Sequence, residues 1–458
     1  MCGIVGVSNI DKAAELAFLG LYALQHRGQE AAGIAAIRDG RATLHKAPGL
    51  VVEGFNDHVM RTLGGRTALG HTRYSTAGGA GLVNAQPITV RYHQGDLALV
   101  HNGNLTNAQT LRDELVRAGS LFQSTVDSEV IVHLIARSRA DSVDEQVHDA
   151  LSQLVGAFCV LITVGDVMYA ARDPWGFRPL VIGRKGDGYV FASETCALDL
   201  IGAELIEEVA PGEIVRVQGG ELSALAPLEP VGEIAPCIFE LIYFARPDSK
   251  VWSVSVDRAR RAFGRQLARE HPADADCVFS VPDSSNSAAL GFSEESGIPY
   301  ELGLIRNHYV GRTFIHPTQA GRDFRVRIKY NAVREVIGGK RVIVVDDSLV
   351  RGTTSKGLIA LIREAGAREV HFRVASPPVV SPCYYGIDMP TRAELIGANK
   401  SVEEIRQHLN VDSLGYISRD GMHAAVADHG PFCDACFGGR YAAPLVDLEG
   451  GLPIASHC

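Results

Sequence analysis

The first half of the chain alternates short apolar runs with segments of helical period. The apolar runs cover residues 4–7, 97–100 and 158–162. The helical segments cover about 12–25, 107–118 and 128–138. Short apolar runs predict strands, and a 3.6-residue period predicts helices with one buried face. We therefore expect sheets packed against helices, ending after the Val-rich strands and Pro/Gly turns of 205–232.

In the second half of the chain, apolar runs alternate regularly with segments of helical period. The runs cover 277–281, 341–345 and 370–374. The helical segments lie near 257–270, 284–297 and 354–365. This alternation predicts parallel strands joined by crossover helices. With 458 residues the chain is too long for one core, so we predict two domains, 1–230 and 231–458.

Composition narrows the function classes. The net charge of −9 gives no general attraction to nucleic acid or anionic membranes. No apolar run approaches the roughly 20 residues of a membrane span, and the start lacks a signal peptide. A cytoplasmic location is therefore expected. In a reducing compartment the nine cysteines are poor candidates for disulfides, so each needs another explanation.

A phosphate site is predicted after the strand at 342–345. Its four β-branched residues suit the centre of a parallel sheet, and Asp346 and Asp347 follow at its carboxyl end. A turn with Gly352 and several hydroxyl residues then enters a helix, where backbone N–H groups can converge on a phosphate. An Asp-Asp pair alone is more often an ordinary capped turn. The whole sequence from the strand at 342–345 through the acidic pair to the Gly352 turn is more specific for a phosphate site.

This string resembles the phosphoribosylpyrophosphate (PRPP) motif of the type I phosphoribosyltransferases. The resemblance implies that Asp346 and Asp347 bind the ribose hydroxyls and a metal. It also implies that the following loop holds the 5′-phosphate, through Ser348, Arg351, Gly352, Thr353 and Thr354. The loop 281–287 resembles the family's pyrophosphate loop, with Ser284 as a further Mg²⁺ contact. Mg²⁺, a hard cation, suits a pyrophosphate leaving group.

A nucleophile is predicted at the N-terminus. Removal of Met1 alone would leave Cys2 with both a thiol and a free α-amine. An α-amine has a pKa near 8 and can accept the thiol proton close to neutral pH. A cysteine at position two is usually incidental when taken alone.

Cys2 is less easily dismissed as incidental when it is taken together with five segments of the chain, at 2–6, 25–30, 71–78, 101–104 and 127–129. In this order they resemble the N-terminal-nucleophile glutamine amidotransferases, over nearly all of 1–230. A glutaminase needs a cation and an anion for a free amino acid, and Arg73 and Asp127 supply them. The oxyanion of amide hydrolysis needs donors, which by resemblance are Asn102 and Gly103. In isolation Asn-Gly reads as a turn, and Arg73 and Asp127 as surface charges.

Together the two halves resemble the glutamine PRPP amidotransferase family. The resemblance implies an α+β N-terminal-nucleophile hydrolase domain of four αββα layers, then an α/β type I phosphoribosyltransferase domain. It implies that ammonia from glutamine reaches PRPP and gives 5-phosphoribosylamine and pyrophosphate, the first step of de novo purine synthesis. Segment 239–249 resembles the family's interdomain signature. Because only neutral ammonia is nucleophilic, we expect an apolar channel.

The same resemblance implies a homotetramer inhibited by purine nucleotides. The basic segment 309–334 is expected to close over PRPP, although a solvated basic loop is the plainer reading. Arg306 and His308 depart from the family's usual Lys-Asn-Arg pattern, which affects pyrophosphate or nucleotide binding nearby. Two other functions stay open, an amino-sugar synthase with the same glutaminase and a PRPP-sensing regulator.

Four cysteines could form one metal site. Cys433 and Cys436 are a C-x₂-C pair, and Cys237 and Cys383 could complete four thiolates. Zinc, an iron–sulfur cluster, a redox pair and incidental spacing all compete. A subgroup of the family matches at all four positions, and this resemblance implies a [4Fe–4S] cluster with a structural and a candidate oxygen-sensing role. The remaining cysteines in apolar surroundings are expected in the core, namely Cys159, Cys196 and Cys277.

Overall fold

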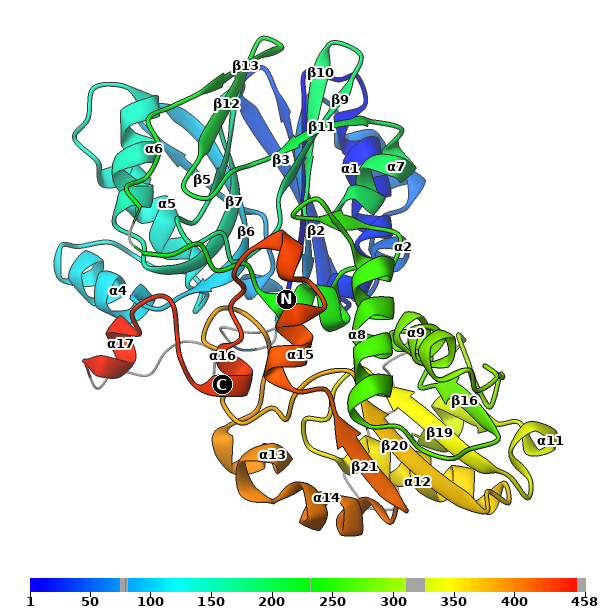
Figure 1. The fold of residues 1–458 in the computed structure, drawn as a ribbon. Helices are drawn as coiled ribbons and strands as arrows, with labels where there is room; N and C mark the ends of the chain where they lie inside the picture. The colour runs from blue at the N-terminus through cyan, green and yellow to red at the C-terminus, as the bar shows by residue number, and fades with distance from the viewer. Residues whose placement is uncertain (75–78, 80, 231, 310–325, 451–458) are drawn as a thin grey trace.

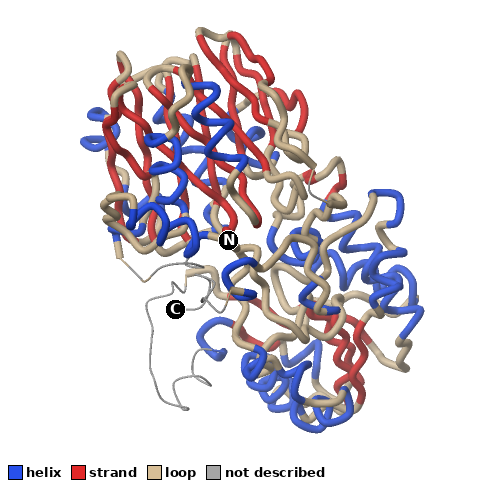
Figure 2. Tube along the Cα trace, turned by 90° about the vertical axis from the view of Figure 1, so that its left-hand side faces the viewer, coloured by secondary structure: helices blue, strands red, loops and turns tan. Residues whose placement is uncertain are grey.

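The computed structural model describes residues 1–74, 79, 81–230, 232–309 and 326–450. In Figure 1 the N-terminal half forms an upper unit of stacked sheets and helices, and the C-terminal half surrounds a smaller sheet below. The turned view of Figure 2 shows the same arrangement, with the N-terminus between the two units. Within the described ranges, no helix has the length and apolarity needed to cross a membrane.

Two antiparallel sheets form the upper unit. The seven-stranded sheet has the order β11 (Glu204–Glu208), β9 (Val181–Lys185), β10 (Gly188–Ala192), β1 (Gly3–Ser8), β4 (Thr67–Arg73), β2 (Ala31–Arg38) and β3 (Arg41–Pro48). The six-stranded sheet has the order β13 (Glu221–Ala224), β12 (Ile214–Gln218), β8 (Val167–Arg172), β7 (Gly156–Val164), β6 (Gly95–Leu105) and β5 (Ile88–Tyr92).

Three apolar cores divide the upper unit into four layers. One core joins the seven-stranded sheet to helices α1 (Ala13–Ala23) and α7 (Thr195–Ile201). A second lies between the sheets, and a third joins the six-stranded sheet to α4 (Ala108–Arg117), α5 (Ser128–Arg137) and α6 (Val143–Ser152). Residues 97–100 of strand β6 are all apolar because Leu97 and Leu99 face the helices while Ala98 and Val100 face the other sheet. The predicted αββα fold is confirmed.

A four-stranded parallel sheet centres the lower unit. Its order is β16 (Cys277–Ser280), β19 (Arg341–Asp346), β20 (Glu369–Val374) and β21 (Ser413–Tyr416). Helices α8 (Val256–Glu270) and α9 (Asn286–Ser296) pack on one face, and α12 (Thr353–Glu364) and α14 (Val402–Leu409) on the other. Both faces of β19 are therefore covered, as its β-branched run predicts.

Shorter elements complete the described chain. They are η1 (Gln25–Arg27), α2 (Val51–Gly54), α3 (Asp57–Thr62), η2 (Leu82–Asn84), the π-helix η3 (Glu240–Phe244), β14 (Lys250–Val251), β15 (Val254–Ser255), β17 (Leu304–Arg306), β18 (Tyr330–Ala332), α11 (Arg334–Ile337), η4 (Arg392–Glu394), α13 (Ile396–Asn399), α15 (Arg419–Ala424), η5 (Ala427–His429), α16 (Ala435–Gly438) and α17 (Val446–Glu449).

The C-terminal segment returns to the upper unit. The buried carboxylate of Asp447 accepts hydrogen bonds from the backbone N–H groups of Gln109 and Thr110, at 2.8 and 3.0 Å. It thereby caps the first turn of α4, whose own preceding residue Asn107 makes no side-chain cap. This contact holds the C-terminal segment against α4 of the upper unit.

Candidate active sites and the cysteine set

Cys2 precedes β1 and lies against the middle of β6. Its backbone nitrogen is 3.1 Å from Asn102 Oδ1, and its Sγ is 3.6 Å from the carbonyl oxygen of Tyr74. The side chain of Asn102 is fully buried, and its Nδ2 has no hydrogen-bond partner in the part of the chain that the structure describes. A buried donor without a partner suits a charge that develops only during reaction.

Gly103 follows in the same strand with φ of +155°. A Cβ there would lie 2.0 Å from the carbonyl oxygen of Ala157, so only glycine fits. The pair Asn102 and Gly103 lies within a long strand, so the alternative reading as a turn is wrong. Strand pairing with β7 holds both residues beside the N-terminus.

Arg73 and Asp127 are buried, so their alternative reading as surface charges is also wrong. Arg73 ends β4, and its guanidinium donates to the carbonyl oxygens of Gly79 and Gly81 at 3.1 and 3.2 Å. Asp127 precedes α5 and accepts from the N–H of Leu105 at 3.0 Å. The structure therefore places one cation and one anion on elements that flank β6.

Arg27 is a site residue to which the sequence analysis gave no role. Its Nε donates to the carbonyl oxygen of Cys2 at 3.1 Å, and its side chain is fully buried. It lies within segment 25–30, one of the five that carried the glutaminase resemblance, so the signal was present without an assigned function. Its neighbour His26 lines a large cavity of the lower unit.

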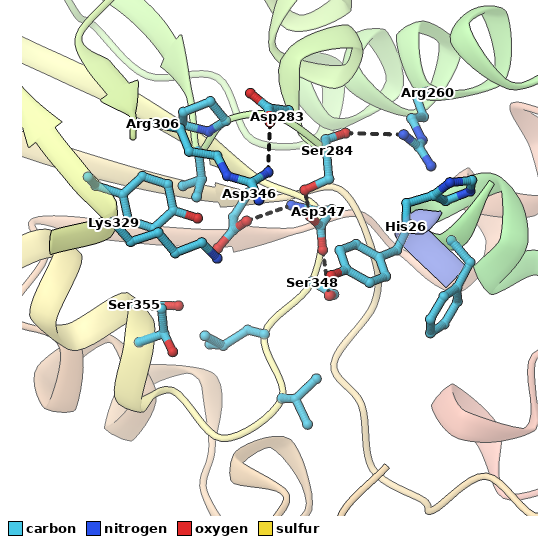
Figure 3. A pocket seen from close by; sticks show the side chains of 18 of the residues that line it. His26, Arg260, Asp283, Ser284, Arg306, Lys329, Asp346, Asp347, Ser348 and Ser355 are labelled. Atoms are coloured by element: carbon cyan, nitrogen blue, oxygen red, sulfur yellow. Dashed lines mark hydrogen bonds and ion pairs between the residues drawn. The ribbon is translucent and has the colours of Figure 1, made fainter. Parts of the chain in front are cut away.

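That cavity has a volume of about 590 Å³ and opens at the carboxyl end of β19 (Figure 3). All the residues predicted to bind PRPP line it, namely Ser284, Asp346, Asp347, Ser348, Arg351, Gly352, Thr353 and Thr354. Gly352 has φ of +76° and starts α12, as the predicted turn requires. The structure thus brings the two predicted loops to one cavity.

Hydroxyl groups and carboxylates meet at its centre. Ser284 Oγ donates to Asp347 Oδ2 at 2.5 Å, and Ser285 Oγ donates to Asp346 Oδ1 at 3.3 Å. Burial raises the pKa of Asp346 well above its usual value, and the charge of Asp347 adds to this. Burial likewise raises the pKa of Asp347. A bound cation would offset both effects, so these oxygen donors fit Mg²⁺.

Two cationic side chains in the cavity wall, Arg260 and Lys329, were not among the predicted site residues. Arg260, from α8, is fully buried, and burial lowers its pKa to about 10 although the charge of Asp347 opposes the shift. Burial also lowers the pKa of Lys329, followed by the charge of Arg306. Lys329 belongs to the basic segment 309–334, whose residues 310–325 lie outside the described ranges.

The two positions that depart from the family pattern lie at the edge of this cavity. Arg306 pairs with Asp283 at 2.7 Å and lines the cavity. His308 lines a smaller cavity of about 210 Å³, which shares Asp283 and Arg306 with the large one. Arg306 therefore faces the predicted PRPP site, whereas His308 does not.

The four cysteines of the predicted metal site gather where the two units meet. Cys237 pairs with Cys433 in an isolated parallel bridge, and three of the four thiols belong to one apolar core, against which Cys433 packs. Burial raises the pKa of Cys436 well above its usual value, with further contributions from the other three thiols. Distant segments of the chain therefore converge at this set.

Among the described residues, no group of three or more His, Cys, Asp or Glu side chains is placed so that it could hold a single metal ion. A cluster interposes iron and sulfide between its cysteines, so it does not need such close donors. The buried guanidinium of Arg178 lies 3.5 Å from the Glu240 carboxylate, and its charge also favours thiolates at Cys237 and Cys383. Four sheltered thiols with a buried cation fit a cluster. Cys159, Cys196 and Cys277 are buried in the core, as predicted.

The fold and the two sites define a glutamine amidotransferase joined to a phosphoribosyltransferase. A family model described as a glutamine amidotransferase domain matches residues 71–200. The chain is 47% identical to the amidophosphoribosyltransferase of Bacillus subtilis, covering 97% of this chain and 94% of that protein. It is 49% identical to amidophosphoribosyltransferase 1 of Arabidopsis thaliana, a chloroplastic protein, over 98% of this chain and 80% of that one.

A solved structure of the B. subtilis glutamine PRPP amidotransferase, complexed with ADP and GMP, superposes with a TM-score of 0.91 at 46% identity, covering 97% of this chain and 98% of that one. The chain belongs to the amidophosphoribosyltransferase family. It transfers nitrogen from glutamine to PRPP in purine biosynthesis. The alternatives of an amino-sugar synthase and a PRPP-sensing regulator are thereby set aside.

Proposed function

We propose that Cys2, once Met1 is removed, is the nucleophile that hydrolyses glutamine. Its thiolate attacks the side-chain amide carbon, the free α-amine having taken the thiol proton. Asn102 Nδ2 and the N–H of Gly103 donate to the resulting oxyanion. The unpartnered, buried Nδ2 next to Cys2 is the observation that carries this proposal. The tetrahedral intermediate then collapses: its C–N bond breaks, ammonia leaves with the proton held by the α-amine, and a thioester remains on Cys2. Water hydrolyses this thioester, which releases glutamate and restores the thiol.

The ends of glutamine are held by opposite charges. Arg73 binds its α-carboxylate, and Asp127 its ammonium group. Both side chains are buried on elements beside β6, where a charged ligand group would find few competing waters. The apolar core at the junction of the units, which includes Phe239, Leu241 and Ile242, supports a water-poor route for ammonia.

In the large cavity, Asp346 and Asp347 would hold the ribose hydroxyls and Mg²⁺, with Ser284 as a further metal contact. The loop from Ser348 to Thr354 would bind the 5′-phosphate through its N–H groups and the start of α12. Mg²⁺, when bound, neutralises the departing pyrophosphate. The burial of both aspartates and their mutual repulsion support a cation here.

Three finer points belong to the same proposal. The four cysteines would bind a [4Fe–4S] cluster that joins the C-terminal segment to the rest of the chain. Purine nucleotides would inhibit, a proposal supported by the complex of the B. subtilis relative with ADP and GMP. The enzyme would work in the cytoplasm as a homotetramer.

Replacing Cys2 with alanine tests the central role. C2A should lose phosphoribosylamine synthesis from glutamine while keeping synthesis from an ammonium salt, because the PRPP cavity is untouched. C277A, which removes a buried thiol from β16, is the control and should keep both activities. Retention of glutamine-supported synthesis by C2A would refute the proposal.

A further inference from the structure

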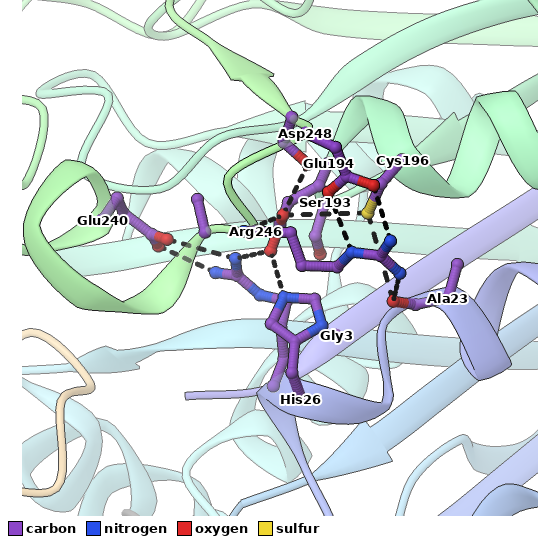
Figure 4. Close-up of polar contacts among 12 residues, drawn as sticks. Gly3, Ala23, His26, Ser193, Glu194, Cys196, Glu240, Arg246 and Asp248 are labelled. Atoms are coloured by element: carbon purple, nitrogen blue, oxygen red, sulfur yellow. Dashed lines mark hydrogen bonds and ion pairs between the residues drawn. The ribbon is translucent and has the colours of Figure 1, made fainter. Parts of the chain in front are cut away.

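Glu194 is a fully buried carboxylate that holds three separate segments of the chain together (Figure 4). It precedes α7. Its Oε1 lies 2.7 Å from His26 Nε2 and accepts from an Arg27 guanidinium nitrogen at 2.5 Å. Its Oε2 accepts from the N–H of Arg246 and from Ser249 Oγ, both at 2.8 Å. One side chain thus joins η1 to the segment that follows η3.

Each nitrogen of the Arg27 guanidinium donates at least one hydrogen bond. Besides Glu194, it donates to both carboxylate oxygens of Glu240 at 3.1 and 2.8 Å, and to the carbonyl oxygen of Cys2. The side chains of Arg27, Glu194 and Glu240 are all fully excluded from solvent. A buried cation is stable only with such partners, so the position of Arg27 depends on both carboxylates.

The hydrogen bond from Arg27 to the Cys2 carbonyl oxygen helps to orient the N-terminal residue. After removal of Met1, no peptide bond precedes Cys2, so its orientation depends on contacts made by its own backbone. Those contacts are the nitrogen with Asn102 at 3.1 Å and the carbonyl with Arg27 at 3.1 Å. A small displacement of the carbonyl would turn the thiol away from the oxyanion donors.

We propose that Glu194 is a positioning residue for the glutaminase reaction, which acts on Cys2 through Arg27. The inference rests on the proposed role of Cys2 as the nucleophile. The same carboxylate carries His26 and Arg246, which both line the PRPP cavity. The link from Glu194 to Cys2 runs through Arg27, which does not line that cavity.

The ionisation of Glu194 agrees with this role. Burial alone would raise its pKa, but the neighbouring His26 and Arg27, together with hydrogen bonds, hold the pKa well below its ordinary value. The carboxylate is therefore charged throughout the pH range in which the enzyme would be assayed.

Glu194→Gln distinguishes the contacts of Oε2 from those of Oε1. The glutamine oxygen can still accept from Arg246 and Ser249 in place of Oε2. Its amide nitrogen would replace Oε1 and confront the Arg27 guanidinium, so two donors would meet. We expect kcat for glutamine-dependent synthesis to fall by about 10- to 100-fold, as for other misplaced nucleophiles. KM for glutamine and the ammonia-dependent rate should stay within about twofold.

Glu208→Gln is the matched control. Glu208 is a half-buried carboxylate in the upper unit, and it accepts from the N–H of Ser253 at 2.9 Å, in the segment after η3. It has no hydrogen bond to Arg27 or His26 among the described residues. E208Q should therefore keep both activities.

The activities of the Glu194 variants with glutamine and with ammonia test the positioning role. A selective loss of the glutamine-dependent kcat in E194Q supports the proposal. Equal loss of the glutamine- and ammonia-dependent activities would show a merely structural role, and unchanged kcat would show none; either overturns it. If E194Q does not fold, E194D keeps the charge but withdraws it from Arg27, and the same selective loss is required. C2A, assayed in parallel, shows separately whether Cys2 is the nucleophile.

Discussion

Replacing Asn102 with alanine probes the oxyanion site directly. The change removes Oδ1, which lies 3.1 Å from the Cys2 nitrogen, and the buried Nδ2 that lacks a partner within the described chain. Removing one such donor costs about 10²–10³ in kcat, or about 2.7–4 kcal/mol of transition-state stabilisation. The side chain is fully buried, so water cannot replace the donor, and we expect a loss near the upper end.

The assay compares two nitrogen sources in one protein. Initial rates of phosphoribosylamine formation are measured with glutamine and with an ammonium salt, at saturating PRPP and Mg²⁺. N102A should lose only the glutamine-dependent kcat, with little change in KM, because the donor acts on the transition state rather than on bound glutamine.

A second buried asparagine provides the control. Asn107 donates to the carbonyl oxygen of Gln153 at 2.9 Å and accepts from the N–H of Val155 at 3.1 Å, so N107A also removes two hydrogen bonds. Neither of these hydrogen bonds involves Cys2. Similar losses in N102A and N107A, or a loss below about fivefold in N102A, would refute the reasoning.

Three further changes test other parts of the molecule. D347N should weaken Mg²⁺-dependent PRPP binding by about 2 kcal/mol, roughly 30-fold in Kd by calorimetry, and unaltered affinity would contradict the cavity assignment. C433S should lose iron and visible absorption after anaerobic reconstitution, whereas C277S should keep both; zinc in the wild-type protein would favour the competing metal. Burial raises the pKa of Asp173 to about 6 from 3.8, so its stabilising contribution is complete below pH 3.8 and is lost as the pH rises through 6. The apparent Tm of the wild type relative to D173N should therefore fall between about pH 4 and 7, and a constant difference would be the contrary result.

Local patterns could group most of the predicted PRPP site because most of its residues are contiguous in the sequence. The segment 354–365 was expected to be helical, and α12 runs over Thr353–Glu364. A strand, an acidic pair and a glycine turn fix their own backbone geometry, so neighbours in sequence remain neighbours in space. Seven of the eight PRPP and Mg²⁺ candidates lie within 346–354. Ser284 reaches the same cavity because its strand, β16, pairs with β19.

Contacts between distant segments could not be predicted in the same way. Glu194 and Arg27 are 167 positions apart, and nothing in the sequence around Glu194 distinguishes it from a surface carboxylate. The capping of α4 by Asp447 spans 338 positions. Such pairings depend on how whole layers pack, and that packing also decides which charges lose contact with water.

By itself, therefore, the sequence determined the elements, their alternation and the chemistry of each loop, since backbone geometry and apolar period are local properties. Only the tertiary structure decided which charges are buried together and how the N-terminal thiol, the acidic strand end and the four cysteines lie around one junction. The physical reason is that the strength of an ion pair or hydrogen bond depends on its surroundings, and those surroundings are assembled from every part of the chain.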